Sequence, residues 1–238
     1  MTRRIPALMR RGGRSGMRAR GGGGAPTMPD SLLSYWASDA TTSAWANRGS
    51  LGTAGDLALQ GTGTPIVSSD ATGAFVSLAG THRYETGAQF STGYAGTSWT
   101  IAVLHDGSST SGRFLFDFLK SGSRLTGRSR AGSALFDILD STYRNYEGFA
   151  PGTLHYEVFV LSGATGNGYL KDDVSDSNNP QVYDPRVIDT LVSMAIGSAH
   201  GGSGPFVGKV RMVTIASGAW GASERAQAQA AVEAEFAL

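Results

Sequence analysis

The sequence predicts an all-β fold, an antiparallel β-sandwich of roughly 200 residues with an extended N-terminal arm and a short C-terminal helix. Many short segments alternate apolar and polar residues at a period of two, which is typical of strands with one buried face. Clusters rich in Gly, Ser, Asn and Asp separate these segments, as turns do. The chain has 238 residues, 34 of them glycine, and a sandwich can reach this length as one domain.

Eight segments are expected to be strands on this pattern. They span residues 74–79, 98–103, 113–120, 134–139, 154–161, 169–170, 191–196 and 206–216. Within 113–120, strict alternation predicts that Phe116 and Phe118 share one face, with Leu115 and Asp117 on the other. Turns are expected at 106–108, 163–168 and 198–204.

The C-terminal segment is the one clear helix. Ser223 is the expected N-cap, and Glu224 lies in the first turn, where the helix dipole favours an anion. Ala228, Val232 and Phe236 recur at intervals of four and define one apolar face. We expect this face to close one edge or end of the sandwich.

Charge divides the chain into two parts. The first 29 residues contain no acid and seven arginines: Arg3, Arg4, Arg10, Arg11, Arg14, Arg18 and Arg20. The remaining residues hold 13 basic and 19 acidic side chains, a net charge of −6 that the overall value of +1 conceals. Four consecutive glycines at 21–24 are typical of a flexible linker between the two parts. We therefore predict an anchoring arm over 1–29 and a sandwich over 30–238.

Several protein classes are disfavoured by composition. The chain has no cysteine, so it has neither disulfides nor thiolate metal sites. It contains no apolar run of 18 residues, and we expect no contact with a membrane. The basic N-terminus lacks the apolar stretch of a signal peptide.

Several short segments occur in the order seen in a known family. They span residues 45–49, 55–61, 98–102, 152–158, 169–172, 194–198, 206–210 and 219–226. This order resembles the concanavalin A-like, laminin-G-like jelly roll of bacterial and phage proteins, over about residues 35–236. Asp173 is a departure, because the family usually has glycine there, and the type of that turn is therefore in question.

Enzymes that share this fold provide a test for catalysis. Family-16-type glycanases need closely spaced carboxylates on one strand, so that one acts as nucleophile and another as acid. Glu147 and Glu157 are isolated, and Asp137 and Asp140 are not at period two. There is no G-x-S-x-G elbow either. We therefore expect no catalytic residues, no glycosidase activity and a non-enzymatic protein.

Histidine and acidic side chains are the candidate metal ligands. The four histidines follow no ligand spacing and are expected to be surface or strand residues: His82, His105, His155 and His200. An acidic segment offers oxygen ligands suited to calcium, although its register is not that of an EF-hand: Asp172, Asp173, Asp176, Asn178, Asn179 and Asp184. An ordinary solvated hairpin loop is the favoured interpretation, so we expect no metal and no cofactor.

Aromatic side chains are the other candidates, because sugars stack on Tyr and Trp rings. Tyrosines in loop-like stretches could serve, and nothing selects among them: Tyr84, Tyr94, Tyr143, Tyr146 and Tyr183. The tryptophans are expected to pack in the core or at edges: Trp36, Trp45, Trp99 and Trp220. A glycan site is thus implied by the resemblance alone.

Together these observations favour a structural virion protein, a head-decoration, spike or tail-associated subunit of a phage or phage-like particle. Its arginines would dock it on other virion proteins, since guanidinium groups pair with carboxylates. We expect a homo-oligomer that displays the jelly roll towards cell-surface glycans. The alternative is a bacterial carbohydrate-binding or glycan-degrading module of the laminin-G-like type. A third interpretation, nucleic-acid binding, rests on the arm alone.

Overall fold

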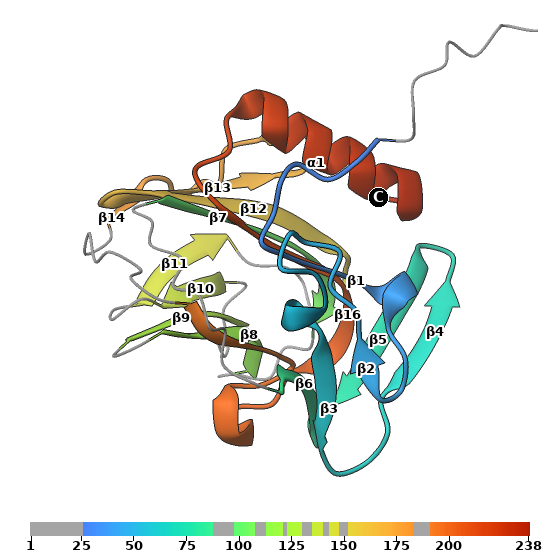
Figure 1. The fold of residues 1–238 in the computed structure, drawn as a ribbon. Coiled ribbons are helices and arrows are strands. Elements are labelled where there is room, and N and C mark those ends of the chain that lie inside the picture. Colours follow the sequence, from blue (N-terminus) through green and yellow to red (C-terminus); the bar gives the residue numbers. More distant parts are fainter. Residues whose placement is uncertain are drawn as a thin grey trace, which may run out of the picture.

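Two antiparallel sheets stacked face to face form the body of the protein, and one helix covers the outer face of one of them (Figure 1). The structure, a computed structural model, describes residues 26–87, 98–107, 113–120, 123–129, 135–139, 143–147, 152–182 and 191–238. The prediction of a concanavalin A-like antiparallel sandwich with a C-terminal helix is confirmed. Residues 1–25 of the predicted arm over 1–29 lie outside the described residues.

Sheet A lies next to the helix and has the strand order β14-β13-β12-β7-β16-β5-β4, with β1 also paired to β16. Its strands are β1 (Leu33–Trp36), β4 (Ile66–Asp70), β5 (Gly73–Ala79), β7 (Ser98–Gly107), β12 (His155–Ser162), β13 (Thr165–Leu170), β14 (Gln181–Val182) and β16 (Val207–Ser217).

Sheet B has the order β11-β10-β9-β8-β15-β6-β3-β2. Its strands are β2 (Ala44–Trp45), β3 (Leu57–Gly61), β6 (His82–Thr86), β8 (Arg113–Lys120), β9 (Ser123–Ser129), β10 (Leu135–Leu139), β11 (Tyr143–Glu147) and β15 (Leu191–Ile196). The helices are α1 (Ala222–Glu235) and the single 3-10 turns η1 (Ala37–Asp39), η2 (Gly52–Gly55), η3 (Lys171–Asp173) and η4 (His200–Gly202).

Both faces of the central strands of sheet A are buried, which is why these strands are almost continuously apolar. On β7, Ile101 and Val103 face sheet B, whereas Ala102 and Leu104 lie under α1. Along β8, β15 and β6 of sheet B, apolar residues that face the core alternate with polar or small residues on the outer face, where Asp117, Ser193 and Ala195 are also buried. Its outer face is therefore the surface on which polar side chains collect.

Helix α1 covers the face of sheet A and not an edge or end of the sandwich, which corrects the sequence prediction (Figure 1). Ala228, Val232 and Phe236 do pack on the sheet, as predicted. The N-cap is Gly221 and not Ser223, because the Glu224 carboxylate accepts the Gly221 N–H at 2.6 Å and starts the helix two residues earlier.

Two local predictions were also wrong. A β-bulge between Phe114 and Phe116 breaks the alternation of β8, so Leu115 packs in the core beside Phe116. Residues 165–168 belong to β13 and not to a turn, because Ser162 already pairs with Thr165 and leaves a two-residue connection. No helix among the described residues is long and apolar enough to cross a membrane.

Candidate functional site

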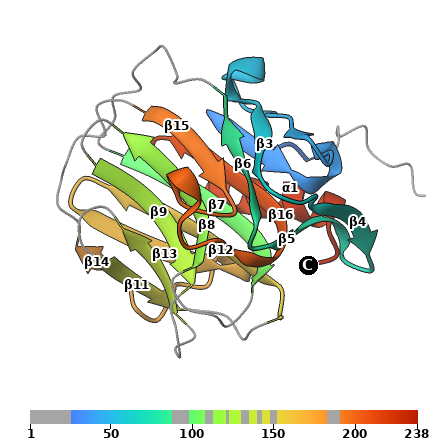
Figure 2. The same cartoon turned by 90° about the horizontal axis from the view of Figure 1, so that it is seen from below.

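Polar side chains from three neighbouring strands and a loop meet on the outer face of sheet B. On β15, Ala195 is in register with Asp117 of β8 on one side and with Glu85 of β6 on the other. These strands lie side by side in Figure 2. Their core-facing neighbours are apolar, so period-two alternation places Asp117 and Glu85 on the outer face. Ser193, two residues before Ala195, shares that face.

The turn η4 brings His200 to this face. The His200 ring lies between Asp117 and Ser193, with Nδ1 3.1 Å from Asp117 Oδ2 and Nε2 2.7 Å from Ser193 Oγ. The His200 main-chain N–H also donates to Asp117 Oδ2, at 2.7 Å. Asp117 is fully buried, and the His200 side chain is 12% exposed. The ring is therefore fixed from two sides and reaches solvent only at its edge.

Glu85 and Arg83 complete the group, which we call the sheet B cluster: Arg83, Glu85, Asp117, Ser193 and His200. Arg83 Nε donates to Glu85 Oε2 at 2.7 Å, and Glu85 Oε1 lies 3.7 Å from His200 Nε2. The Arg83 and Glu85 side chains are each 19% exposed. Arg83 has no other hydrogen-bond partner among the described residues, so its terminal Nη1 and Nη2 have no hydrogen-bond partner there.

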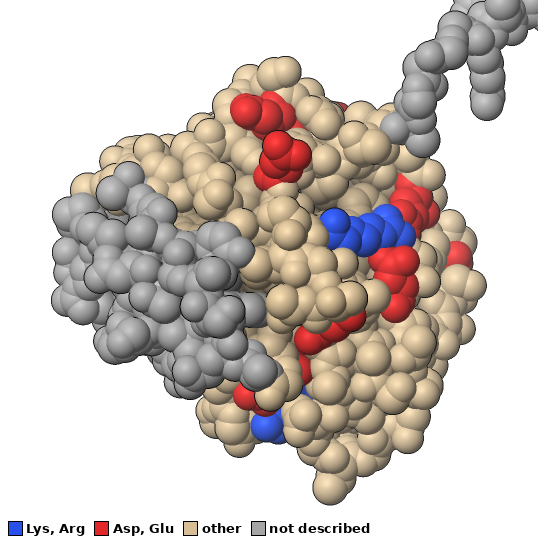
Figure 3. Space-filling model, viewed as in Figure 1, with Lys and Arg blue, Asp and Glu red and all other residues tan. Residues whose placement is uncertain are grey.

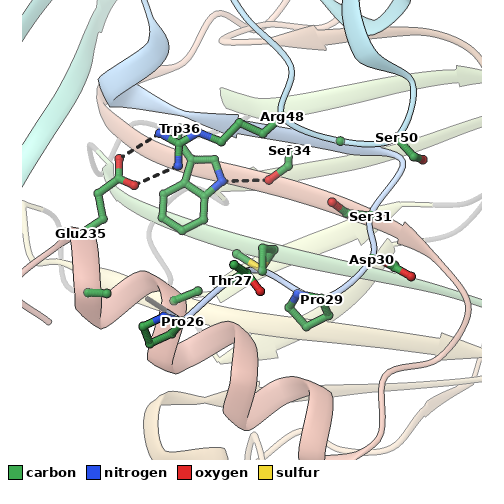
Figure 4. A pocket seen from close by; sticks show the side chains of 14 residues that line it. Pro26, Thr27, Pro29, Asp30, Ser31, Ser34, Trp36, Arg48, Ser50 and Glu235 are labelled. Carbon is green, nitrogen blue, oxygen red and sulfur yellow. Dashed lines mark hydrogen bonds and ion pairs between the residues drawn. The ribbon is translucent and has the colours of Figure 1, made fainter. Parts of the chain in front are cut away.

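A groove of about 630 Å³ lies on another side of the molecule, between α1, β1 and residues 26–31 (Figure 4). Trp36 forms its aromatic wall, yet both faces of the indole are covered. Phe236 stacks at 5.8 Å between ring centroids, and the Arg48 guanidinium lies 4.8 Å from the ring centroid. Arg48 is ion-paired with Asp39 and Glu235. No sugar ring can stack on Trp36 without displacing Arg48.

A second groove, of about 340 Å³, flanks α1 on the side of β13. The Arg225 guanidinium covers the Tyr169 ring at 3.6 Å and is paired with Asp173. The Tyr156 hydroxyl is buried and has no hydrogen-bond partner among the described residues. Burial, followed by the charges of Glu233 and Asp173, raises the pKa of Tyr156 well above its ordinary value. This groove thus offers one neutral hydroxyl and no open aromatic face.

The four histidines are all inside or nearly inside the protein, and none is a surface residue. His105 and His155 lie between the sheets with ring centroids 5.4 Å apart. Burial lowers the pKa of His155 to about 4, against the opposing effect of Asp176, and burial together with His155 lowers the pKa of His105. Both are therefore neutral at pH 7. His155 also lies 3.0 Å from the buried Glu157 carboxylate.

The described part of the acidic segment is engaged with protein partners. Asp172 and Asp173 both adopt left-handed backbone conformations, with φ of 61° and 57°, a region that Asp tolerates better than most residues. Gln229 bonds to Asp172, and Arg225 pairs with Asp173. Asp184 lies outside the described residues. No group of three or more His, Asp or Glu side chains suited to a metal ion occurs in the described part of the chain, and the expectation of no metal and no cofactor stays a prediction.

The other predicted site residues do not join the cluster. Tyr84 is not in a loop but in β6, where it is fully buried and donates its hydroxyl to Thr41 O at 2.6 Å. Tyr94 and Tyr183 lie outside the described residues, as do the side chains of Tyr143 and Tyr146. All four tryptophans are buried, as predicted. The seven arm arginines, Arg3, Arg4, Arg10, Arg11, Arg14, Arg18 and Arg20, also lie outside.

Sequence reasoning missed the cluster because its members are dispersed between positions 83 and 200. The search for carboxylates tested spacing along one strand, whereas Glu85 and Asp117 come from two strands separated by β15. One signal was present. Asp117 interrupts the apolar run 114–119, and a charge in such a run is buried only with a partner.

Comparisons with known proteins match the fold. No family model matches the chain, and no curated protein matches it. Domain 4 of AbnA, a GH43 extracellular arabinanase from Geobacillus stearothermophilus solved with arabinotriose, superposes with a TM-score of 0.60 at 15% identity, over 87% of this chain and 98% of that domain.

Two further matches are parts of larger chains. A GH54 α-L-arabinofuranosidase superposes with a TM-score of 0.60 at 9% identity, over 89% of this chain and 60% of that one. The binding domain of botulinum neurotoxin DC in complex with SialylT gives 0.57 at 8% identity, over 86% and 51%. Identities this low show a shared β-sandwich fold and leave the activity to be argued from the site.

Proposed function

We propose that this domain is a carbohydrate-binding β-sandwich module and that it holds neutral glycans on the outer face of sheet B, at the sheet B cluster. The observation that carries the proposal is the open end of Arg83, whose Nη1 and Nη2 have no partner among the described residues. Sugar hydroxyls both donate and accept hydrogen bonds. Arg83 supplies donors, and the Glu85 carboxylate supplies acceptors beside it.

The charge of the cluster favours a neutral sugar over an acidic one. Arg83 contributes one positive charge, and Glu85 and Asp117 contribute two negative charges, so these three side chains are net negative. The carboxylate of a sialylated glycan would lie beside the Glu85 carboxylate at the Arg83 guanidinium. Like charges at contact distance repel, and partial burial strengthens that repulsion.

The matched structures support a glycan ligand by analogy. The arabinanase domain was solved in complex with arabinotriose, and the superposition with this chain covers 98% of that domain. The two grooves beside α1 are weaker candidates, because Arg48 and Arg225 occupy the aromatic faces that a sugar would use.

Calorimetric titration with arabinotriose and with sialyllactose tests the proposal. Arg83→Gln should weaken arabinotriose binding at least about tenfold, equivalent to roughly 1.4 kcal/mol, and sialyllactose should bind more weakly than arabinotriose. Arg48→Gln is the matched control, because Arg48 is also an ion-paired surface arginine, and it should bind as the unchanged protein does. Equal binding by Arg83→Gln, or lost binding in the Arg48→Gln control, contradicts the site.

The virion assignment remains a second proposal, supported by the composition of the arm. Seven arginines and no acid precede residue 30, while the rest of the chain is net negative. None of the matched structures named above is a virion protein. If the arm docks the domain on an acidic subunit surface, replacing Arg10, Arg11, Arg14, Arg18 and Arg20 with serine should release it from a particle. Equal retention of both forms would refute docking by the arm.

A further inference from the structure

We propose that Ser193 is a nucleophile that accepts the acyl group of a carboxylic ester, with His200 as its general base and Asp117 as the residue that positions His200. This activity goes beyond glycan binding and does not depend on it. The sequence gives no hint of it, because the three residues lie on β8, on β15 and in the η4 turn.

The distances are those that proton transfer requires. Ser193 Oγ lies 2.7 Å from His200 Nε2, and His200 Nδ1 lies 3.1 Å from Asp117 Oδ2. A nucleophile and base within hydrogen-bond reach, with the base oriented by a third group, form the recurrent arrangement for covalent catalysis by serine. The order along the chain is Asp117, Ser193, His200, and the roles follow from geometry and not from that order.

The hydrogen bonds also define the protonation pattern. An ionised carboxylate only accepts, so Asp117 holds the proton of neutral His200 on Nδ1. Nε2 is then an acceptor, and the Ser193 hydroxyl donates to it. The His200 N–H bond to the same Asp117 oxygen fixes the ring relative to the strand. The tautomer needed for general-base catalysis is therefore the one that the structure stabilises.

The reaction balances without a cofactor. Ser193 Oγ attacks the ester carbonyl carbon while its proton passes to His200 Nε2. The tetrahedral intermediate expels the alcohol, which takes that proton from His200, and an acyl-serine remains. Water, activated by His200 in the same way, hydrolyses the acyl-serine to a carboxylic acid and restores Ser193. When His200 is protonated, Glu85 Oε1, 3.7 Å from Nε2, adds a second negative charge that stabilises it.

The surroundings of Ser193 depart from a regular ladder. The pairing of β15 with β8 changes register between Leu191 and Ser193, and the Met194 N–H donates to the hydroxyl of Thr86 on β6, at 3.2 Å. Such irregularities are over-represented next to active sites.

The same bonds could serve only to hold residues 198–204 on sheet B, and labelling separates the two roles. We would treat the full chain with a fluorophosphonate, measure its intact mass and follow hydrolysis of p-nitrophenyl acetate. Ser34→Ala is the matched control, because Ser34 is also a buried serine but bonds to Thr214. We expect one adduct on the unchanged protein and on Ser34→Ala, and none on Ser193→Ala.

Kinetics then test the two supporting residues. Asp117→Asn should lower kcat by on the order of 10⁴-fold with KM nearly unchanged, and imidazole should partly restore a His200→Ala variant. An unchanged protein that forms no adduct, or a Ser193→Ala variant that is still labelled, overturns the proposal. So does a folded Ser193→Ala protein that hydrolyses the ester at the original rate. Arabinotriose binding by the unchanged protein, measured alongside, tests the glycan site separately, because it does not require the ester to be hydrolysed.

Discussion

At the scale of single residues, a buried arginine on β16 pairs with two carboxylates outside the sheet B cluster. Arg211 is only 2% exposed, and its two terminal nitrogens lie 3.1 and 2.9 Å from the two oxygens of Asp70. Asp106 lies 3.4 Å from the same guanidinium. The hydrogen bonds from Arg211 and then from Lys209 hold the pKa of Asp70 well below its ordinary value.

We predict that Asp70→Asn destabilises the protein by about 1–3 kcal/mol at pH 7, because a buried guanidinium loses a charged partner. The folded pKa of Asp70 is depressed, so this stabilisation is complete above the unfolded value of 3.8 and is lost as the pH falls below it. Urea unfolding at pH 7 and pH 3 measures the effect. Asp30→Asn, at an exposed position, is the control. A penalty that persists undiminished at pH 3 would disprove this linkage.

Individual side chains also show which features of the site can be predicted from the sequence and which cannot. The burial of the tryptophans could be predicted, because large aromatic rings seek the core. The burial of Tyr84 and the pairing of Asp117 with His200 could not, because each depends on a partner more than 40 residues away. The chemistry of each side chain could be read from the sequence, but which side chains meet in the folded protein could not.

At the scale of elements, long alternating strands were predictable and short ones were not. Strands β7, β8, β12 and β16 match the expected segments 98–103, 113–120, 154–161 and 206–216. β2 and β14 have two residues each and are too short for any periodic pattern to be detected in the sequence. The bulge in β8 shifts one residue to the other face. A bulge depends on how two strands pair, so the sequence of β8 alone does not predict it. Helix α1 was predictable because its apolar stripe recurs every four residues.

We predict that Phe236→Ala lowers the free energy of unfolding by about 3–5 kcal/mol. Phe236 is buried at the end of α1, stacks on Trp36, and so holds the helix against sheet A. Guanidinium unfolding measures the loss. Glu233→Ala, an exposed change on the same helix, should stay within about 0.5 kcal/mol. Similar stability of the two variants would show that the helix contributes little to the fold.

At the scale of the whole molecule, the layers explain where function can reside. Helix α1 covers the outer face of sheet A, and the sheets cover each other, so the outer face of sheet B remains for polar chemistry (Figures 1 and 2). The charged side chains on the face in Figure 3 are mostly acidic, in keeping with the negative charge of residues 30–238. This layering was predictable as a class, because only a sandwich or barrel buries so many short strands.

We predict that removing residues 1–25 leaves the melting temperature within about 5 °C of its original value, because the sequence shows no periodic apolar pattern before Leu32. Removing residues 1–31 should lower it further. Pro29 is buried, Met28 packs beside α1, and Gln227 donates to Thr27 O at 2.9 Å. Calorimetry on both truncations measures the difference. A large drop from the shorter truncation would mean that the arm packs into the sandwich.

Glycan recognition on the outer face of sheet B is tested most directly by following amide and arginine Nε resonances during titration with arabinotriose. The largest shifts should fall on Arg83, Glu85, Ser193 and His200, with the Arg83 Nε signal moving as its guanidinium gains partners. The resonances of Arg48 and Trp36, in the groove beside α1, should stay in place. Shifts centred on Arg48 and Trp36, or no shifts at saturating sugar, would contradict the account.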